Sequence, residues 1–374
     1  MINFDNSAGT FPKPPSVRRA VSNAMRFFGG NPGRGGHRLS SAAAEQVYLV
    51  RKKAASLFSA QPENVAFTPN CTFALNMALK GIMQYGGHMI LSGYEHNAAS
   101  RPAYYLMKER GVRVSVLEIY DSDEETLSAL ESLIRPDTLC VCMMAVSNVT
   151  GRILPYKAAA ELCRDKGICF VCDGAQACGV LDISLDDGMS FLCTSGQKGL
   201  YGPTGTGLLI SSGEYPLSTI IEGGTGTNSG DLTQPPLLPE RLESGSLNTA
   251  GIIGLGAGID FVRSTGISRI RAHEKSLCDQ LEKGLAEQGS GGVYDSDKPR
   301  APLTAFYLNG IDPEEASRRL SDAGFALRAG LHCAALAHET LGTTDCGALR
   351  FSPSAFNTPA EVAKLLSVID RISA

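Results

Sequence analysis

Short apolar runs alternate with longer amphipathic segments through the first 210 residues of the chain. Seven runs have the length of buried strands: 65–67, 88–91, 112–119, 139–146, 168–172, 191–193 and 207–210. Five segments between them repeat apolar residues at helical spacing: 41–59, 72–84, 98–110, 126–133 and 156–166. Strands that alternate with helices usually pair in parallel, because each helix returns the chain to the same end of the sheet. The pattern predicts an α/β fold with a mostly parallel, seven-stranded sheet.

The sequence changes character after residue 210. Residues 211–240 are rich in Gly, Pro, Ser and Thr, which predicts a long loop. Helical spacing resumes at 251–262, and the remainder alternates helices with short strands such as 301–308, a pattern typical of a smaller α+β domain. We therefore expect three parts, which are an N-terminal segment at 1–15, a large domain at 16–258 and a small domain at 259–374.

Composition and charge exclude two kinds of partner. The 374 residues are 43% hydrophobic and 19% charged, and 34 basic side chains face 38 acidic ones. The formal net charge of −4 provides no strong positive field for nucleic acid or an anionic membrane surface. No basic stretch followed by an apolar one opens the chain, and no run of about 18 apolar residues occurs. We expect a cytoplasmic protein that binds neither nucleic acid nor membrane.

The 11 cysteines lie mostly inside apolar runs such as 140–144. This placement is typical of buried, reduced thiols rather than disulfides. The one CxxC pair, Cys169 and Cys172, falls in a predicted strand, where period-two alternation points the side chains to opposite faces. No second pair supplies further zinc ligands, so we expect no metal site.

Two polar residues follow neighbouring strands and indicate a cofactor. Lys198 comes just after the strand at 191–193, in a glycine-rich stretch that permits close approach of a ligand. Asp173 ends the strand at 168–172, where it either caps the next helix or faces a ligand. Both side chains can reach one crevice at the carboxyl ends of the strands. An imine-forming lysine and an aspartate that pairs with a pyridinium nitrogen are the two groups that pyridoxal phosphate (PLP) requires.

The motif Ser195-Gly196-Gln197-Lys198, followed by Gly202 and Gly205-Thr206-Gly207, resembles the lysine signature of class V aminotransferase-fold enzymes. Within that group the chain resembles the type II members of the cysteine desulfurase and selenocysteine lyase branch. The resemblance runs from Phe4-Asp5-Asn6-Ser7-Ala8 to Arg350-Phe351-Ser352. It implies the PLP-dependent transferase fold of type I. The large domain would bind PLP, the segment 1–15 would pack near the active site, and the small domain would carry the nucleophile loop.

The resemblance also assigns residues to the cofactor. Lys198 would bind the PLP aldehyde and move protons, Asp173 would hold the ring nitrogen protonated, and His96 would stack on the ring and take part in catalysis. Gln176 and Asn148 match residues that bind the phenolic oxygen, and Asn148 also reaches the substrate. The residues implied at the phosphate are Cys71, Thr72, Ser195, Gln197 and, from the other subunit, Ser246. A homodimer with shared sites is thereby implied.

The segment from Arg328 to Ala334 matches the pattern Arg-x-Gly-x-His-Cys-Ala of type II desulfurases, with Cys333 in the position of the nucleophile. Arg328 and His332 would favour its thiolate. Arg350 and Arg328 match arginines that bind the substrate carboxylate, for which a planar guanidinium is well suited. The segment 31–40 resembles the N-terminal active-site segment of the family, in which His37 approaches the substrate.

We therefore expect a PLP-dependent cysteine desulfurase that converts L-cysteine to L-alanine and leaves a persulfide on Cys333, with a sulfur-acceptor protein as a further partner. A selenocysteine lyase, a cysteine sulfinate desulfinase and a class V aminotransferase or epimerase are alternatives on the same scaffold. A docking protein for a sulfur acceptor is the non-enzymatic alternative. Gln197 and Leu331 stand where the branch often has histidine, and Gly199 adds a residue after the lysine, which indicates an outlying subgroup.

Overall fold

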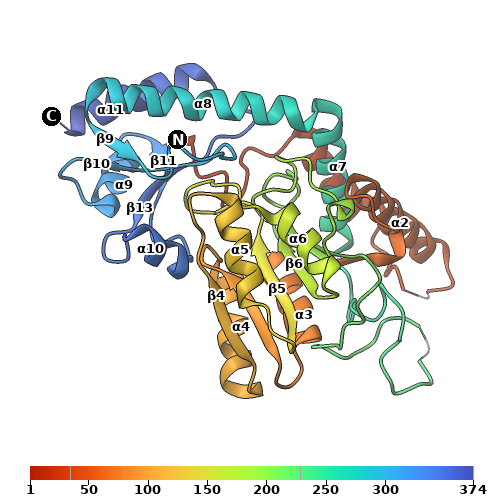
Figure 1. The fold of residues 1–374 in the computed structure, drawn as a ribbon. Coiled ribbons are helices and arrows are strands. Elements are labelled where there is room, and N and C mark those ends of the chain that lie inside the picture. The colour runs from red at the N-terminus through yellow and green to blue at the C-terminus, as the bar shows by residue number, and fades with distance from the viewer. Residues whose placement is uncertain (34, 228, 374) are drawn as a thin grey trace.

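The computed structural model describes residues 1–33, 35–227 and 229–373. Its centre is a seven-stranded sheet in the order β2-β8-β7-β6-β5-β3-β4 (Figure 1). The strands are β2 (Val65–Thr68), β3 (His88–Ser92), β4 (Arg113–Leu117), β5 (Thr138–Met144), β6 (Cys169–Asp173), β7 (Phe191–Ser195) and β8 (Gly207–Ser211). Only β8 runs antiparallel to its neighbours, β2 and β7. The predicted seven strands and the mostly parallel sheet are confirmed.

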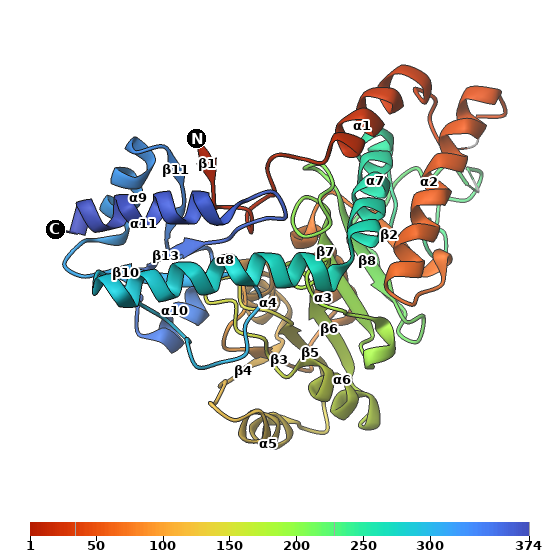
Figure 2. The ribbon, with the colours of Figure 1, turned by 90° about the horizontal axis from the view of Figure 1, so that it is seen from above.

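Helices cover both faces of this sheet. One face packs against α2 (Arg38–Leu57), α5 (Asp123–Leu133), α6 (Tyr156–Asp165) and α7 (Thr249–Thr265), and the other against α3 (Cys71–Ile82) and α4 (Asn97–Arg110). Figure 2 shows α7 lying between α2 and α1 (Pro15–Phe27), with which it packs. Cys169 and Cys172 belong to the cores on opposite faces, as their alternation predicted. Two short 3-10 turns, η1 (Pro62–Asn64) and η2 (Leu185–Asp187), complete this part.

The second part of the molecule has its own sheet and core. Its antiparallel sheet has the order β12-β13-β10-β9, formed by β9 (Gly291–Val293), β10 (Thr304–Leu308), β12 (Arg328–Gly330) and β13 (Ala348–Phe351). Its helices are α8 (Ile267–Gln288), α9 (Pro313–Asp322), α10 (Ala335–Leu341) and α11 (Pro359–Ser373). The N-terminal β1 (Ile2–Asn3) pairs in parallel with β11 (Phe325–Ala326), and Phe4 enters this second core. The predicted boundary between residues 258 and 259 lies inside α7, whose Val262 packs with Ile270 of α8.

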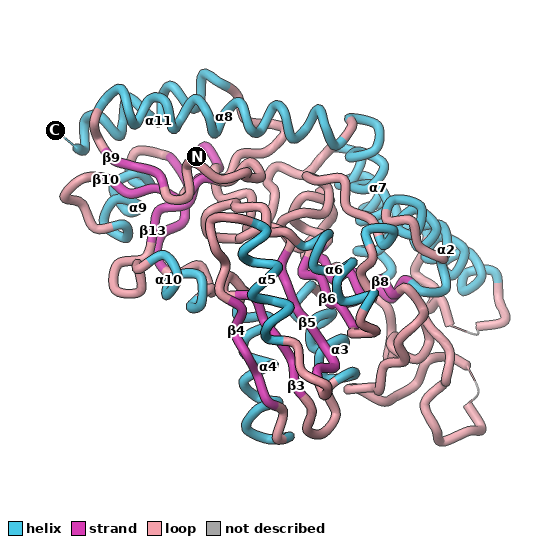
Figure 3. Tube along the Cα trace, viewed as in Figure 1, coloured by secondary structure: helices cyan, strands magenta, loops and turns pink. Residues whose placement is uncertain are grey.

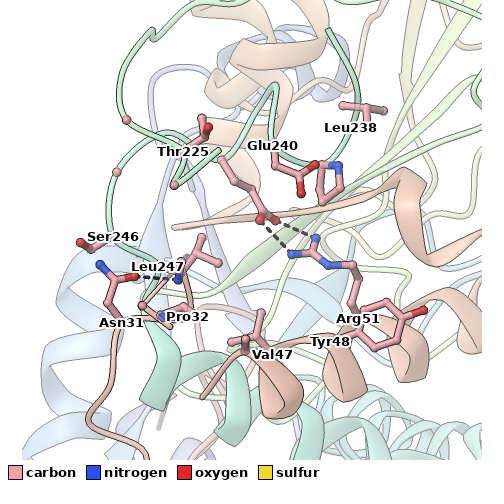
Figure 4. Close-up of a pocket in the computed structure, with 18 of the residues that line it drawn as sticks. Asn31, Pro32, Val47, Tyr48, Arg51, Thr225, Leu238, Glu240, Ser246 and Leu247 are labelled. Carbon is pink, nitrogen blue, oxygen red and sulfur yellow. Dashed lines mark hydrogen bonds and ion pairs between the residues drawn. The ribbon is translucent and has the colours of Figure 1, made fainter. Parts of the chain in front are cut away.

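A long loop joins β8 to α7, and its described residues, 212–227 and 229–248, form neither helix nor strand. Near its end Glu243 accepts two hydrogen bonds of 2.8 Å from Arg51 of α2 (Figure 4). Glu243 also accepts from the backbone N–H of Phe67, and Arg51 donates to the carbonyl of Val65. The buried ion pair therefore satisfies the open edge of β2, which would otherwise expose unpaired backbone groups.

Loops gather between the large sheet and the second part of the molecule, as the pink segments of Figure 3 show. They include the connections that leave the carboxyl ends of β5, β6 and β7. Ligands of open α/β sheets bind at such ends. Within the described ranges, every helix is too short or too polar to cross a membrane.

Candidate active site

A cavity of about 360 Å³ opens at the carboxyl ends of β5, β6 and β7, against the β12–α10 segment. Twelve of the residues predicted to form the site line it: Cys71, Thr72, His96, Asn148, Asp173, Gln176, Ser195, Gln197, Lys198, Arg328, Cys333 and Arg350. They come from stretches far apart in the sequence. The crevice expected at Lys198 and Asp173 is therefore present, and many other side chains line it.

Lys198 stands in a tight loop that follows β7. The backbone N–H of Gly196 donates to the carbonyl of Thr206, and that of Gly202 donates to the carbonyl of Gly196. The backbone N–H of Tyr201 donates to the carbonyl of Lys198 itself. Burial lowers the pKa of the Lys198 amine, while the carboxylate of Asp173 acts in the opposite direction. An amine with a lowered pKa is more often neutral and therefore more nucleophilic towards an aldehyde.

Asp173 is buried at the end of β6, where its Oδ1 atom accepts two hydrogen bonds. One comes from the backbone N–H of Ala175 at 2.9 Å and the other from the thiol of Cys71 at 3.3 Å. No donor among the described residues reaches the second oxygen, Oδ2. The carboxylate is thus fixed by one oxygen and keeps the other for a ligand in the cavity.

The amino end of α3 closes the cavity on another side. Asn70 caps the helix by accepting from the N–H of Phe73, and the N–H of Cys71 donates to Ser195 Oγ at 3.3 Å. The exposed Thr72 hydroxyl stands in the first turn. Free N–H groups and the helix dipole favour an anion at such a position. The backbone of Cys71 is part of this end, but its thiol points to Asp173 instead.

His96 caps the next helix, α4. Its Nδ1 atom accepts from the N–H of Ala98 at 2.9 Å, so the ring proton lies on Nε2. Burial lowers the pKa of His96, which keeps the ring neutral. Asn148 donates from Nδ2 to the carbonyl of His332 at 2.9 Å, and Gln176 donates from Nε2 to the carbonyl of Ser7 at 3.1 Å.

Cys333 lies on a four-residue turn between β12 and α10. Its φ is +56° and that of His332 is +49°, so two consecutive non-glycine residues adopt the left-handed region. The turn is closed by a 2.9 Å hydrogen bond from Ala334 N–H to the carbonyl of Leu331. The carbonyl of Cys333 accepts from the N–H of Asn97 at 2.7 Å. The backbone of the turn is therefore tied to the large domain while the thiol is exposed in the cavity.

Exposure separates Cys333 from most other cysteines. In the described part of the chain nine cysteines are buried, and only Cys333 and Cys346 are exposed. Burial raises the pKa of thiols such as Cys142 and Cys193 well above the usual value. Buried protonated thiols are poor nucleophiles. Of the two exposed thiols, that of Cys333 lines the cavity.

His332 differs from its predicted role. The side chain is buried, and its Nε2 donates to the carbonyl of Ala348 at 3.0 Å. Burial, together with the nearby charge of Arg350, lowers its pKa to about 2. The expectation that His332 supplies positive charge to the Cys333 thiolate is therefore wrong, because the imidazole is neutral. The same role for Arg328 stays a prediction.

The two arginines at the other end of the cavity share one carboxylate. Arg350 is buried and donates from Nη2 to Asp5 Oδ1 at 2.8 Å and from Nη1 to the carbonyl of Asn148 at 2.9 Å. Arg328 donates from Nε to Asp5 Oδ2 at 3.2 Å. Asp5 belongs to the N-terminal motif Phe4-Asp5-Asn6-Ser7-Ala8, which by itself indicates no partner for its carboxylate. The available signal was chemical, since a buried arginine requires a counter-charge.

His37 and Ser246 do not line this cavity. His37 caps α2, with Nδ1 accepting from the N–H of Ser40 at 3.2 Å. Ser246 lines a larger cavity of about 860 Å³, in which it lies with Asn31 at one end and Arg51 at the other (Figure 4). Arg34, in the same predicted segment as His37, lies outside the described residues. A contact of Ser246 with a second subunit stays a prediction, as does an approach of His37 to the substrate.

Unpartnered polar atoms test whether the cavity suits PLP. Among the described residues, nine buried side-chain atoms lack a hydrogen-bond partner, and five of them belong to residues that line this cavity: Ser7, Asn148, Gln197, His332 and Arg350. Such a concentration of unsatisfied groups is typical of a site built for a polar ligand. The available groups are an amine of lowered pKa, a carboxylate with one free oxygen, a neutral imidazole and a helix amino end. They fit the aldehyde, ring nitrogen, ring face and phosphate of PLP.

Comparison with known proteins agrees with this geometry. The Aminotransferase class-V family model matches residues 2–365. A probable cysteine desulfurase of Pyrococcus abyssi is 31% identical over all of this chain and 94% of its own length. One of Methanothermobacter thermautotrophicus is 30% identical over 98% of this chain and 94% of its own. The apo structure of a cysteine desulfurase from Thermococcus onnurineus is 30% identical, covers 100% of this chain and 94% of its own, and superposes with a TM-score of 0.91.

The family match spans nearly the whole chain, and the similar structure superposes over all of it. On these grounds the protein has the PLP-dependent transferase fold of type I and belongs to the class V aminotransferase family.

Proposed function

We propose that this protein is a PLP-dependent cysteine desulfurase, which converts L-cysteine to L-alanine and holds the sulfur as a persulfide on Cys333. The observation that carries the proposal is the position of Cys333. Its exposed thiol lines the same cavity as the buried amine of Lys198 and the two arginines. Relatives called cysteine desulfurases, similar over the full chain, support the same reaction.

Different residues of the cavity would hold different parts of the cofactor. When bound, PLP supplies an aldehyde for an amine and a ring that accepts electrons from the substrate carbon. Lys198 would supply the amine, Asp173 would pair with the ring nitrogen, and the neutral His96 would contact the ring. Thr72 and Ser195, with the amino end of α3, would hold the phosphate.

Substrate is oriented by its carboxylate, which pairs with Arg350 and Arg328. Lys198 would take the proton from Cα and return protons to the product, for which its lowered pKa is suited. The Cys333 thiolate attacks the substrate sulfur, and a sulfur–sulfur bond forms as the carbon–sulfur bond breaks. The bonding electrons stay with the carbon fragment, which gains a proton and leaves as alanine. The enzyme retains one sulfur atom as a persulfide.

The test uses the PLP-loaded enzyme with L-cysteine and a thiol reductant, and measures alanine and sulfide. Cys333→Ser should lower the rate of alanine formation by more than about 100-fold, since the nucleophile is removed. Cys346→Ser is the matched control, because Cys346 is the other exposed cysteine in the described chain and does not line the cavity. Mass spectrometry of the wild-type enzyme should find the persulfide on Cys333. Unchanged sulfide release by Cys333→Ser would rule out the proposal.

Incubations of the same enzyme with other substrates separate the alternative functions. Alanine from selenocysteine or cysteine sulfinate in the Cys333→Ser variant would indicate a lyase or desulfinase, because those leaving groups depart more easily. Amine transfer to pyruvate without sulfide would indicate an aminotransferase. Failure to bind PLP would favour a docking protein.

We also infer a cytoplasmic homodimer in which Ser246 reaches the phosphate bound to the other subunit. The large cavity lined by Ser246 supports this assembly, as does the exposed apolar side chain of Met25, which lines a neighbouring cavity together with Ser246. Ser246→Ala should weaken PLP binding without changing the mass measured by sedimentation. A protein that accepts the sulfur completes the set of proposed partners.

A further inference from the structure

Lys13 belongs to the N-terminal segment and contacts the loop that carries Lys198. Its Nζ atom donates to the backbone carbonyl of Gln197 and to Thr10 Oγ1, both at 2.7 Å. No carboxylate in the described part of the chain forms a salt bridge with this ammonium. Burial lowers the pKa of Lys13 to about 8. A partly buried charge without a counter-charge is costly, so the two oxygens that it binds are the reason to look for a role.

Thr10 extends this contact to both peptide groups that flank Lys198. Its N–H donates to the carbonyl of Gln197 at 3.0 Å, and its hydroxyl lies 3.1 Å from the same oxygen and 3.4 Å from the carbonyl oxygen of Lys198. Because an ammonium can only donate, the Thr10 oxygen accepts from Lys13 and directs its own proton to the loop. The two carbonyls precede and follow the Cα atom of Lys198. Holding them fixes the direction in which its side chain leaves the backbone.

The segment that carries Lys13 is itself anchored. Nε2 of Gln176 donates to the carbonyl of Ser7 at 3.1 Å, and the N–H of Ser7 donates to Ser352 Oγ at 3.0 Å. Prolines stand at positions 12, 14 and 15, and their fixed φ limits the freedom of the backbone on both sides of Lys13. The ammonium therefore holds the loop from a rigid support.

An amine attacks an aldehyde only from a narrow range of distances and directions, so a small error in its placement is costly. We propose that Lys13 is a positioning residue, which fixes the backbone of Lys198 and so aims the Lys198 amine at the PLP aldehyde. Lys13 is not among the residues that line the cavity and acts through the loop. The inference rests on the PLP binding included in the proposed function.

The first experiment tests whether Lys13 acts through Lys198. Lys13→Met is made in the wild type and in Lys198→Ala, and equilibrium dialysis of each apoenzyme measures its affinity for PLP. In the wild type the substitution should weaken binding by about tenfold, because two hydrogen bonds from a charged donor are lost. In Lys198→Ala no amine remains to be aimed, so the dissociation constant should change by less than about twofold. Equal losses in the two backgrounds, or no loss in either, would overturn the proposal.

The second experiment follows the bond that Lys198 forms with the PLP aldehyde on loss of water, through its absorbance after apoenzyme and saturating PLP are mixed. Lys13→Met should slow this step by about tenfold, and Lys13→Arg, which keeps a charged donor, should recover most of the rate. Lys166→Met is the control, because Lys166 pairs with Glu131 and neither residue lines the cavity. An arginine variant as slow as Lys13→Met would contradict the proposal.

A further variant keeps the proposal testable if Lys13→Met does not fold. Thr10→Val preserves the shape of the side chain but removes the hydroxyl that links Lys13 to the loop. It should slow formation of the Lys198–PLP bond by about threefold, as expected for one lost hydrogen bond. An unchanged rate would count against the proposed contact.

These measurements involve no sulfur and therefore separate this inference from the proposed function. An enzyme that forms alanine and sulfide, but in which Lys13→Met leaves both PLP affinity and the rate unchanged, would overturn only the role of Lys13. The expected losses in a protein that releases no sulfur would overturn only the desulfurase.

Discussion

At the scale of single residues, Cys71 has a contact that the family resemblance does not imply. Its thiol donates to Asp173 Oδ1 rather than facing the phosphate position. Burial, followed by the negative charge of Asp173, raises the pKa of Cys71 well above the usual value, so the sulfur keeps its proton and remains a donor. The thiol and the N–H of Ala175 together fix one oxygen of Asp173 and leave the other for a ligand.

Cys71→Ala should weaken PLP binding by about tenfold, because a hydrogen bond to a charged carboxylate contributes about 1.5 kcal/mol. Cys71→Ser keeps a donor of similar size and should retain most of the affinity. Titration of the apoenzyme with PLP, followed by absorbance, measures both. Equal affinities of the two variants would show that the thiol only fills space.

At the scale of the elements, the long loop after β8 is held by one buried ion pair. Arg51 of α2 and Glu243 of the loop bind each other and the backbone of β2. The same ion pair fixes the segment that leads to Ser246. Removal of one partner from such a pair leaves an uncompensated buried charge, which costs far more than the pair contributes as a whole.

Arg51→Ala should therefore lower the free energy of unfolding by about 3–5 kcal/mol. The double variant Arg51→Met with Glu243→Leu should recover much of the loss, because two apolar side chains leave no charge unpaired. Urea unfolding measures both variants. A loss below about 1 kcal/mol for Arg51→Ala would mean that water reaches Glu243.

The helices and strands also show what the sequence can predict. Buried parallel strands are continuous apolar runs, so all seven were found, and the five predicted helices end within three residues of the observed ones. Helix α1 was not predicted, because only Val17 and Ala24 are buried among its polar residues. The antiparallel direction of β8 was not predicted either, since apolar content does not encode strand direction.

The candidate site was predictable where motifs carry the chemistry, as for Lys198 and Asp173. Properties that depend on packing were not. The neutral state of His332 follows from its burial, and the ion pairs of Asp5 follow from two arginines brought to it from β12 and β13. Neither of these can be read from spacing along the chain.

At the scale of the whole molecule, two buried carboxyl groups make stability depend on pH. Glu95 lies directly before His96 and accepts from the N–H of Met144. Glu274 of α8 accepts from the hydroxyl of Tyr201, which itself accepts from the N–H of Ala355 and so joins the lysine loop to the smaller domain. Burial raises the pKa of both glutamates from 4.5 to about 8.

Between about pH 4.5 and 8 the folded protein keeps protons on these groups that the unfolded chain has lost. Stability is therefore greatest below this window and falls as the pH rises through it, by up to about 1.4 kcal/mol per pH unit for each group. Urea unfolding from pH 5 to 9 should show this slope. Glu95→Gln combined with Glu274→Gln mimics the protonated forms and should flatten it, whereas an unaltered slope would assign the dependence to other groups.

The turn that carries Cys333 restricts how sulfur can leave. β12 ends at Gly330 and α10 begins at Ala335. Between them, the carbonyls of Cys333 and His332 accept hydrogen bonds from Asn97 and Asn148. Because this turn is short and hydrogen-bonded, it cannot move outwards. A persulfide on Cys333 would therefore stay in the cavity until an acceptor enters. Free thiols of low mass could diffuse in unaided, whereas a protein recipient would need a slender projection with its reactive group at the tip. The rate of sulfur transfer would then depend on the shape of the acceptor.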